Sequence, residues 1–399
     1  MASVATKNTW LILHRWFGII TALFLFIAAV TGSVLTARAT IDRWANDDLF
    51  AYTGEAAERL APIDAVALYE AANPAIQVTG FPLSSEPAEN IIITVAPKPG
   101  EAPLDYEEVF LNPVSGEAVG MRSTDPGLSN RQIIPLILEL HYNLLVGDVG
   151  RIFMGFVAIG WLISAGIGLY LTFPRKGPFF KNWRPAWTYS PKRSLARQML
   201  DIHRASALWL FPFLFILAFT SVTLNFFSEF WDPFATTIAP LEKSLFHLDA
   251  PYPEGAVPQL TYADALALAE SQAATVGTEW KPATMLYYQN WNLYGTTFSD
   301  TGDLNYKYLG PIYHYFDAVS GDWIHEVNPY TDSAGLVMIR AVYPLHSGEI
   351  GGWLTVFFVF VLGLATAEQC FTGIWLWLKR RGPRVAAKKK TDSSASAKA

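Results

Sequence analysis

Four of the seven histidines stand at corresponding places beside long apolar segments. His14 and His203 are each followed by arginine and each open such a segment, while His141 and His346 each follow a leucine shortly before one. A six-coordinate haem needs two axial nitrogen ligands on opposite sides of its iron, in an apolar pocket between helices. The two pairs therefore predict two b-type haem groups with these four axial ligands. A structural metal or a proton relay is the alternative chemistry.

The histidines correspond because the sequence is internally repeated. Without a gap, "LHRWFGIITALFLFIAAVTGSVLT" from Leu13 aligns with "IHRASALWLFPFLFILAFTSVTLN" from Ile202. In the same way, the segment from His141 to "FPRKGP" aligns with the segment from His346 to "LKRRGP". We therefore expect two tandem copies of one unit, which consists of a span, an external domain, a histidine and a second span.

The composition indicates a membrane protein, because 51% of the residues are hydrophobic and only 16% are charged, whereas about a quarter are charged in ordinary globular domains. A spanning helix needs about 20 apolar residues. Four segments are long enough: Trp16–Ala37, Ile152–Phe173, Ala205–Phe227 and Trp353–Leu378. The expected fold is a polytopic α-helical membrane protein, a four-helix transmembrane bundle made of two tandem repeats, each with an inserted α+β module.

Charge predicts the orientation of the spans. The N-terminus up to Arg15, the short loop 174–204 and the tail 379–399 hold 18 of the 29 Lys and Arg residues, with only Asp201 and Asp392 as acids. By the positive-inside rule, both termini and the short loop are cytoplasmic. The two large loops then face the periplasm from a bacterial inner membrane. The net charge of −6 averages a basic inner face with an acidic outer face and does not indicate nucleic-acid binding.

These patterns divide the chain into eight segments. The expected order is transmembrane helix 1 (8–38), periplasmic module 1 (39–131), an interfacial helix with transmembrane helix 2 (132–176), a cytoplasmic loop (177–201), transmembrane helix 3 (202–228), periplasmic module 2 (229–332), an interfacial helix with transmembrane helix 4 (333–381) and a cytoplasmic basic tail (382–399). The last part of the tail, "KKKTDSSASAKA", has the composition of a disordered end.

The outer pair of histidines requires a turn in the chain. A continuous helix would carry His141 about 16 Å beyond the second span at 1.5 Å per residue. Glycines in "LVGDVGR" and "SGEIGG" permit a turn before each span. The apolar segments "RQIIPLILELHYNLL" and "LVMIRAVYPLH" are therefore predicted to lie on the membrane surface as short helices that fold each histidine back over the bundle.

Several other residues have weaker indications. Arg15 and Arg204 follow the inner histidines and are candidates to bind haem propionates, although they equally mark the positive inner boundary. Glu368 lies inside the fourth span and must face the bundle interior or water. His247, His314 and His325 are interpreted as surface residues, with substrate contact open for the last two. Arg151 is a weaker outer candidate.

The two large loops share one order of elements. "LAPIDAVALYEAANPA" reads as a helix before strands "IQVTGFPL", "NIIITVAP" and "YEEVFLNPVSGEAVGM". In the second loop, "LTYADALALAESQA" precedes "ATMLYYQNWNLYGTTF" and "IYHYFDAVSGDWIHEV". The matched "NPVSGE" and "DAVSGD" predict hairpin turns. The many tyrosines of the second loop suit either a flat, polar-edged ligand or a strand-rich core.

These motifs resemble the PepSY-associated transmembrane family over residues 8–384. The resemblance rests on "HR" opening spans one and three, "LH" ahead of spans two and four, "PRKGP" and "KRRGP" closing them, and the helix-then-strands modules. The family includes inner-membrane di-haem reductases of ferric siderophores. The resemblance therefore implies an oxidoreductase with two haem b groups, one near each leaflet, that reduces ferric siderophore iron in the periplasm and so releases ferrous iron.

The electron donor must lie outside this chain. The sequence contains no Gly-rich dinucleotide motif and no P-loop, and its cytoplasmic segments are too short for a nucleotide-binding domain. A membrane quinol or a cytoplasmic flavoprotein is the expected donor. Two other functions remain open: a non-enzymatic protein whose PepSY modules regulate a peptidase, and a haem or iron permease.

Overall fold

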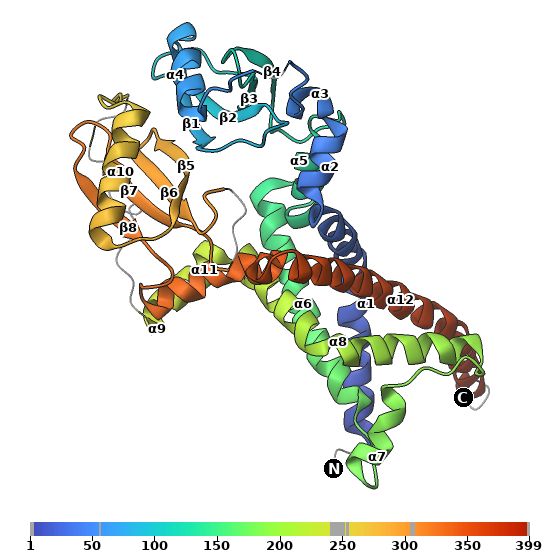
Figure 1. Cartoon of the computed structure of the whole chain (residues 1–399). Coiled ribbons are helices and arrows are strands. Elements are labelled where there is room, and N and C mark those ends of the chain that lie inside the picture. Colours follow the sequence, from blue (N-terminus) through green and yellow to red (C-terminus); the bar gives the residue numbers. More distant parts are fainter. Residues whose placement is uncertain (1–3, 56, 240–251, 253–254, 304–307, 397–399) are drawn as a thin grey trace.

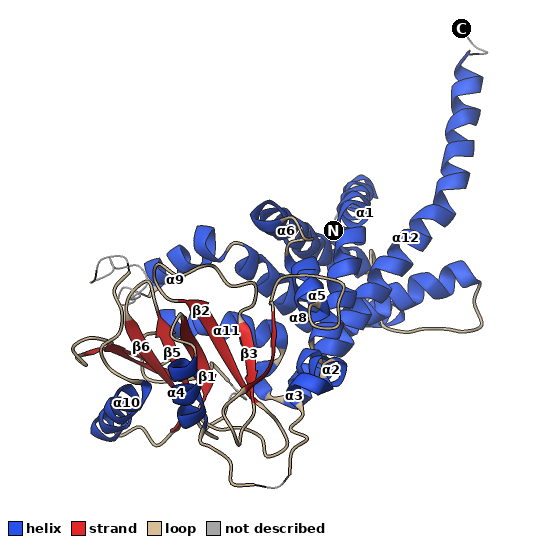
Figure 2. Ribbon diagram, turned by 90° about the horizontal axis from the view of Figure 1, so that it is seen from above, coloured by secondary structure: helices blue, strands red, loops and turns tan. Residues whose placement is uncertain are grey.

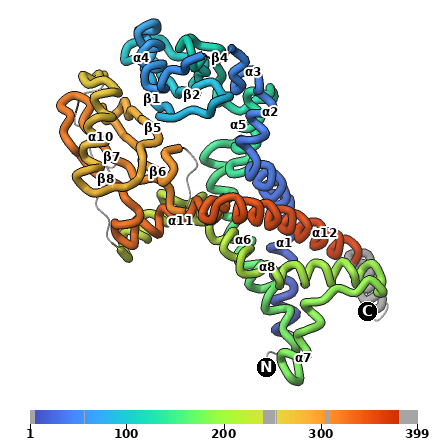
Figure 3. The backbone as a smooth tube through the Cα atoms, viewed as in Figure 1, coloured from blue at the N-terminus to red at the C-terminus, as the bar shows by residue number. Residues whose placement is uncertain are grey.

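The computed structural model describes residues 4–55, 57–239, 252, 255–303 and 308–396. Long helices form a bundle at one end of the molecule, and a β-sheet with two covering helices lies at the other end (Figure 1). Both described chain ends lie at the end of the bundle away from the sheet (Figure 3). Below, the two ends of the bundle are called the sheet side and the terminal side.

Four helices are long and apolar enough to cross a membrane, as the sequence predicts. Many of their apolar side chains point outward: Ile20 is 65% exposed and Phe156 is 62% exposed. Exposed apolar surface of this kind suits contact with lipid tails. The helices are α1 (Val4–Leu35), α6 (Gly147–Thr172), α8 (Leu195–Asn225) and α12 (Trp353–Ser396).

The four helices pack in a ring in which each contacts two neighbours. Helix α1 packs on α6 and α12, and α8 packs on the same two helices. Helices α1 and α8 therefore lie diagonally across the bundle. Small residues allow close packing in this ring, since a Cβ added at Gly363 of α12 would clash with the Ser33 hydroxyl of α1. Inward-pointing side chains of α1 and α8 can meet at the centre.

Two short helices precede the second and fourth spans, as predicted. Helix α5 (Ile133–Tyr142) packs on α1 and carries His141, while α11 (Ala334–Ser347) packs on α8 and carries His346. Gly147 and Gly348 follow these helices with φ of +60° and +87°. A left-handed backbone costs glycine little, so the chain can reverse there and enter the span. A 3₁₀ turn, η4 (Glu349–Gly351), leads into α12.

The two predicted modules form one continuous sheet, which the sequence did not predict. All eight strands are antiparallel, in the order β4-β3-β2-β1-β5-β6-β7-β8. Each large loop supplies four neighbouring strands, and the halves meet where β1 pairs with β5. The strands are β1 (Ile76–Pro82), β2 (Ile91–Pro97), β3 (Glu108–Leu111), β4 (Ala118–Arg122), β5 (Lys281–Tyr288), β6 (Leu293–Ser299), β7 (Ile312–Asp317) and β8 (Trp323–Val327).

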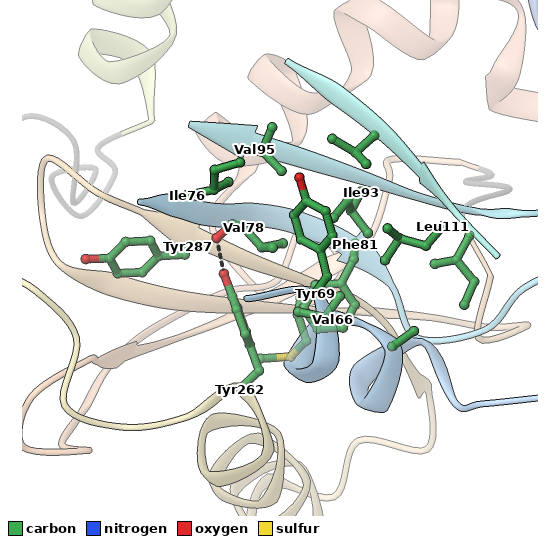
Figure 4. Packing of buried hydrophobic residues seen from close by; sticks show 14 of the residues in the cluster. Val66, Tyr69, Ile76, Val78, Phe81, Ile93, Val95, Leu111, Tyr262 and Tyr287 are labelled. Atoms are coloured by element: carbon green, nitrogen blue, oxygen red, sulfur yellow. Dashed lines mark hydrogen bonds between the residues drawn. The ribbon is translucent and has the colours of Figure 1, made fainter. Parts of the chain in front are cut away.

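The two halves of the sheet share one hydrophobic core. Helices α4 (Pro62–Ala72) and α10 (Tyr262–Val276) both contribute to it, together with buried side chains of β1, β2, β3, β5 and β6. The Tyr262 hydroxyl donates a hydrogen bond to the Val78 carbonyl in the other half (Figure 4). Because the core crosses the β1–β5 junction, the two halves stabilise one another.

The two "VSG" motifs form matching turns, as predicted. Asn112 Oδ1 accepts hydrogen bonds from the backbone N–H groups of Val114 and Ser115 between β3 and β4. Asp317 Oδ1 accepts from Val319 and Ser320 between β7 and β8. An Asn or Asp side chain that bonds the backbone two residues ahead stabilises a turn.

The structure differs from the prediction in several connecting elements. Helices absent from the prediction are α2 (Arg38–Ala45), α3 (Asp47–Phe50), α7 (Phe179–Trp183), the 3₁₀ turn η1 (Arg184–Ala186), the π-helical turn η2 (Phe227–Trp231) and α9 (Asp232–Ile238). Helix α8 begins inside the predicted loop. Helix α12 continues through the predicted disordered tail and projects beyond the other helices (Figure 2), because Ala and Lys favour helix and extending a formed helix needs no new nucleus.

Candidate functional site: two facing pairs of histidines in the bundle

One pair of histidines meets near the terminal side of the bundle. His14 on α1 and His203 on α8 come from the diagonal helices, and their ring centroids lie 6.4 Å apart with an interplanar angle of 63°. We call this the terminal-side pair. Both rings are half-buried. Two residues that are distant in sequence thus face one another across the centre of the bundle.

The second pair lies on the sheet side. His141 on α5 and His346 on α11 have ring centroids 6.1 Å apart and an interplanar angle of 56°. We call this the sheet-side pair. The two pairs occupy different levels of the bundle, because Thr31, which contacts His141, lies about 25 Å along α1 from His14 at 1.5 Å per residue.

Each of the four rings is anchored through its Nδ1 atom to a neighbouring helix. His141 Nδ1 lies 3.1 Å from Thr31 Oγ1, and His346 Nδ1 lies 3.1 Å from Thr220 Oγ1. On the terminal side, His14 Nδ1 lies 3.0 Å from both the carbonyl and the hydroxyl of Ser164, and His203 Nδ1 lies 2.9 Å from Thr372 Oγ1. An anchored Nδ1–H leaves Nε2 as the nitrogen available for a ligand.

Glycines make room for three of the four rings. A Cβ added at Gly32 would lie 2.8 Å from Cε1 of His141, which is too close without movement. A Cβ at Gly168 would lie 3.1 Å from Cε1 of His14. A Cβ at Gly373 would lie 3.5 Å from Cε1 of His203. The absence of a side chain therefore lets these imidazoles lie against the neighbouring helix.

The spacing within each pair fits one metal ion between two imidazoles. An imidazole nitrogen bonds a transition metal at about 2.0–2.1 Å and lies about 1.1 Å from its ring centre, so rings on opposite sides of one ion have centres about 6.3 Å apart. The observed separations are 6.4 Å and 6.1 Å. Within the described part of the chain, no three or more His, Cys, Asp or Glu residues gather as a metal-binding group. Each pair can therefore supply two axial ligands.

Arg204 has a protein partner on the terminal side. Its Nη2 atom lies 2.8 Å from Oδ1 of Asp201, which is fully buried and also contacts Arg193 and Arg197 at 3.2 Å. The buried carboxylate fixes the start of α8 and offsets one of three positive charges. Arg15 is half-buried beside His14. Both arginines therefore lie on the side of the bundle that holds this pair.

Arg151 is explained without a cofactor. Its guanidinium forms an ion pair with Glu229 at 2.6 Å and another with Asp148 at 3.1 Å. It also donates to the Asn225 carbonyl. These contacts join the start of α6 to the end of α8, so the residue stabilises the sheet side of the bundle.

The sheet side also contains a half-buried carboxylate near the histidines. Glu349 lies in the turn after α11, and its Oε1 is 3.7 Å from Nη2 of Arg38. Burial raises the pKa of Glu349, while Arg38 acts in the opposite direction. The ion pair connects the start of α2 with η4.

Glu368 faces the bundle interior, as its position in a span requires. Its Oε2 accepts a hydrogen bond of 2.7 Å from the Ser206 hydroxyl on α8. Its Oε1 lies 3.1 Å from Thr372 Oγ1, the same atom that contacts His203. Sequence reasoning found this carboxylate but missed the hydroxyls of Ser164 and Thr372, whose only signal was their polarity within apolar spans.

The interpretation of His314 as a surface residue was wrong. Its ring is fully buried between Phe298 and Trp323, because strand β7 is covered on both faces. His325 is half-buried on β8, and His247 lies outside the described residues. The tyrosines of the second module mostly serve the core: Tyr287, Tyr294 and Tyr315 are all less than 5% exposed. They favour the strand-core interpretation over a ligand surface.

Comparison with known families agrees with the four spans. The family described as "PepSY-associated TM region" matches residues 11–380, nearly the whole chain. The chain belongs to this family. The PepSY-associated match covers the two histidine pairs, all four spans and the eight-stranded sheet. No curated protein matches the chain.

Proposed function

We propose that this protein is an inner-membrane di-haem b oxidoreductase that reduces ferric siderophore iron at its sheet side. The observation that carries the proposal is the two facing histidine pairs, each spaced for one six-coordinate iron, at two levels of one bundle. Haem suits two-residue sites because its macrocycle supplies the other four ligands. When bound, the two haem groups would carry electrons singly across the membrane.

The protein's own residues hold and orient the ligands. The Nδ1 contacts to Thr31, Thr220, Ser164 and Thr372 orient the rings, and a protonated Nδ1 in these contacts would leave Nε2 to bind the iron. Apolar side chains of the surrounding helices, such as Leu208 and Leu362, are buried inside the bundle. Arg15 and Arg204 supply positive charge for haem propionates on the terminal side.

The orientation and the duplication belong to the same proposal. The concentration of Lys and Arg in the terminal-side segments favours a cytoplasmic terminal side and a periplasmic sheet. Equivalent contacts, such as Thr31 with His141 and Thr220 with His346, support an origin in two tandem repeats. A membrane quinol or a cytoplasmic flavoprotein would then deliver electrons to the terminal-side pair. The motif order resembles that of the ferrioxamine reductase FoxB.

The test is reoxidation of prereduced protein. The purified protein is reduced, excess reductant is removed, and a ferric hydroxamate or catecholate chelate is added anaerobically while the haem α band is recorded. We expect the band to disappear as ferrous iron appears. Stable reduced bands would favour a permease instead, and purified protein without haem would favour a non-enzymatic PepSY protein that regulates a peptidase.

A single variant tests the separate roles of the sheet-side pair and the terminal-side pair. His141→Ala should abolish reoxidation by the chelate while the terminal-side haem remains bound. Retained chelate reduction in this variant would contradict the proposed electron order.

A further inference from the structure

A half-buried carboxylate lies one hydroxyl away from a histidine of the terminal-side pair. Glu368 is an expensive residue in the hydrocarbon region, where ionisable side chains usually have a specific partner. Among the described residues, no ion pair includes Glu368. Its hydrogen-bond partners among the described residues, Ser206, Gln369 and Thr372, are polar and uncharged.

A hydrogen-bonded path links this carboxylate to His203. The Thr372 hydroxyl lies 2.9 Å from His203 Nδ1 and 3.1 Å from Glu368 Oε1. When Nε2 is a metal ligand, Nδ1 carries the proton and donates to the hydroxyl oxygen. The hydroxyl has one proton to donate, and Glu368 offers it two acceptors: the backbone carbonyl lies 2.8 Å and Oε1 lies 3.1 Å from Thr372 Oγ1. Thr372 therefore lies between the imidazole of His203 and the side chain of Glu368.

Further donors hold the carboxylate in place. The Ser206 hydroxyl donates to Oε2 at 2.7 Å, and the Gln369 amide donates to the same oxygen at 3.2 Å. Gln369 also donates to the Ser206 hydroxyl. These contacts join the carboxyl group to α8 as well as to its own helix.

The opposite ligand has no such path. His14 Nδ1 contacts only the carbonyl and hydroxyl of Ser164 among the described residues. The position that corresponds to Glu368 in the first half of the chain is Ile163, an apolar residue. Glu368 is therefore linked to His203 alone, and the terminal-side pair differs in this respect from the sheet-side pair.

We propose that Glu368 is a positioning residue that acts through Thr372 on His203 and lowers the reduction potential of the terminal-side haem. A carboxylate behind a ligating histidine orients the ring and increases its basicity. Its negative charge also favours the ferric state over the ferrous state. A lower potential on the terminal side directs electrons toward the sheet-side haem. This inference rests on the proposed function.

The test is an equilibrium redox titration of the purified full-length protein, followed by its absorption spectrum and by low-temperature EPR of the ferric haems. Glu368→Gln should shift the reduction equilibrium of one haem about tenfold toward the ferrous form, which equals about 59 mV for one electron. The other haem should keep its potential. Because Glu368→Gln could disturb folding, Thr372→Val provides a second interruption of the same path.

Thr366→Val is the matched control, since Thr366 is a buried threonine of α12 whose hydroxyl donates to Leu362 of its own helix. We expect Thr372→Val to reproduce the upward shift, the double variant to show no further shift, and Thr366→Val to match the wild type. Unchanged potentials in Glu368→Gln and Thr372→Val, with both haems bound, would overturn this inference alone. A wild-type protein without haem would overturn the proposed function as well.

Discussion

His141 and His346 face one another with ring centroids 6.1 Å apart, although one lies on α5 and the other on α11. Both rings also contact the diagonal helices, His141 through Ala28 and Thr31 of α1 and His346 through Thr220 of α8. The short helices α5 and α11 therefore bring these residues against the bundle. The three predictions that follow concern the anchoring of these rings, the space around them and the attachment of the sheet.

The two threonine anchors on the sheet side should differ in importance. His141 Nδ1 has a second acceptor, the Ala28 carbonyl at 2.9 Å, whereas His346 Nδ1 contacts only Thr220 among the described residues. Loss of an outer-shell partner typically lowers metal affinity about 10–100-fold. We expect Thr220→Val to weaken retention of the sheet-side haem by that amount and Thr31→Val to weaken it less. Haem dissociation measured by transfer to apomyoglobin would show this order, and equal rates would refute it.

Gly32 should be sensitive to the addition of a single methyl group. Its Cβ would lie 2.8 Å from Cε1 of His141, so Gly32→Ala must displace the ring. Overpacking of this kind costs about 1–3 kcal/mol. We expect selective loss or weakening of the sheet-side haem. Gly18→Ala on the same helix is the control, because no heavy atom lies within 4 Å of its added Cβ. Equal haem content in the two variants would contradict the proposed role of the glycine.

Arg122 should be important for attachment of the sheet to α2. Its guanidinium contacts Asp42 at 2.8 Å and Glu108 at 2.5 Å, and its side chain is 10% exposed. Burial lowers the pKa of Arg122, but the two carboxylates outweigh this effect and raise it above its usual value. Arg122→Ala would leave two partly buried carboxylates without a cation and should cost about 3–5 kcal/mol.

Hydrogen exchange at β3 and β4 measures this loss. Arg43→Ala is the control. Arg43 lies on α2 beside Asp42 and forms a more exposed ion pair with Glu89. Such exposed pairs contribute less than about 1 kcal/mol to stability. Similar protection in the two variants would show that the Arg122 cluster does not anchor the sheet.

Much of the helical architecture was predictable from the sequence. The spans were visible because about 20 consecutive apolar residues have few alternatives to a membrane helix. The short helices were visible because glycines separated them from the spans. The start of α8 was missed because the helix continues through residues 195–201, where polar and apolar residues are mixed, and local composition does not fix that boundary.

The continuous sheet and the ring anchors were not predictable in the same way. Pairing of β1 with β5 joins residues of different loops, such as Gly80 and Leu286, and depends on exposed strand edges that local patterns do not encode. The buried position of His314 likewise follows from the packing of β7 against its neighbours. The contacts of Thr220 with His346 and of Thr372 with His203 join residues on different helices, so they depend on how the helices pack.

The most direct measurement of the central claim is the haem content of the wild type and of four histidine-to-alanine variants. The account predicts two haems per chain in the wild type. His14→Ala and His203→Ala should lose the same haem, identified by its potential and EPR signal, and His141→Ala and His346→Ala should lose the other. Wild-type protein without haem from haem-replete cells, or variants of one pair that lose different haems, would contradict it.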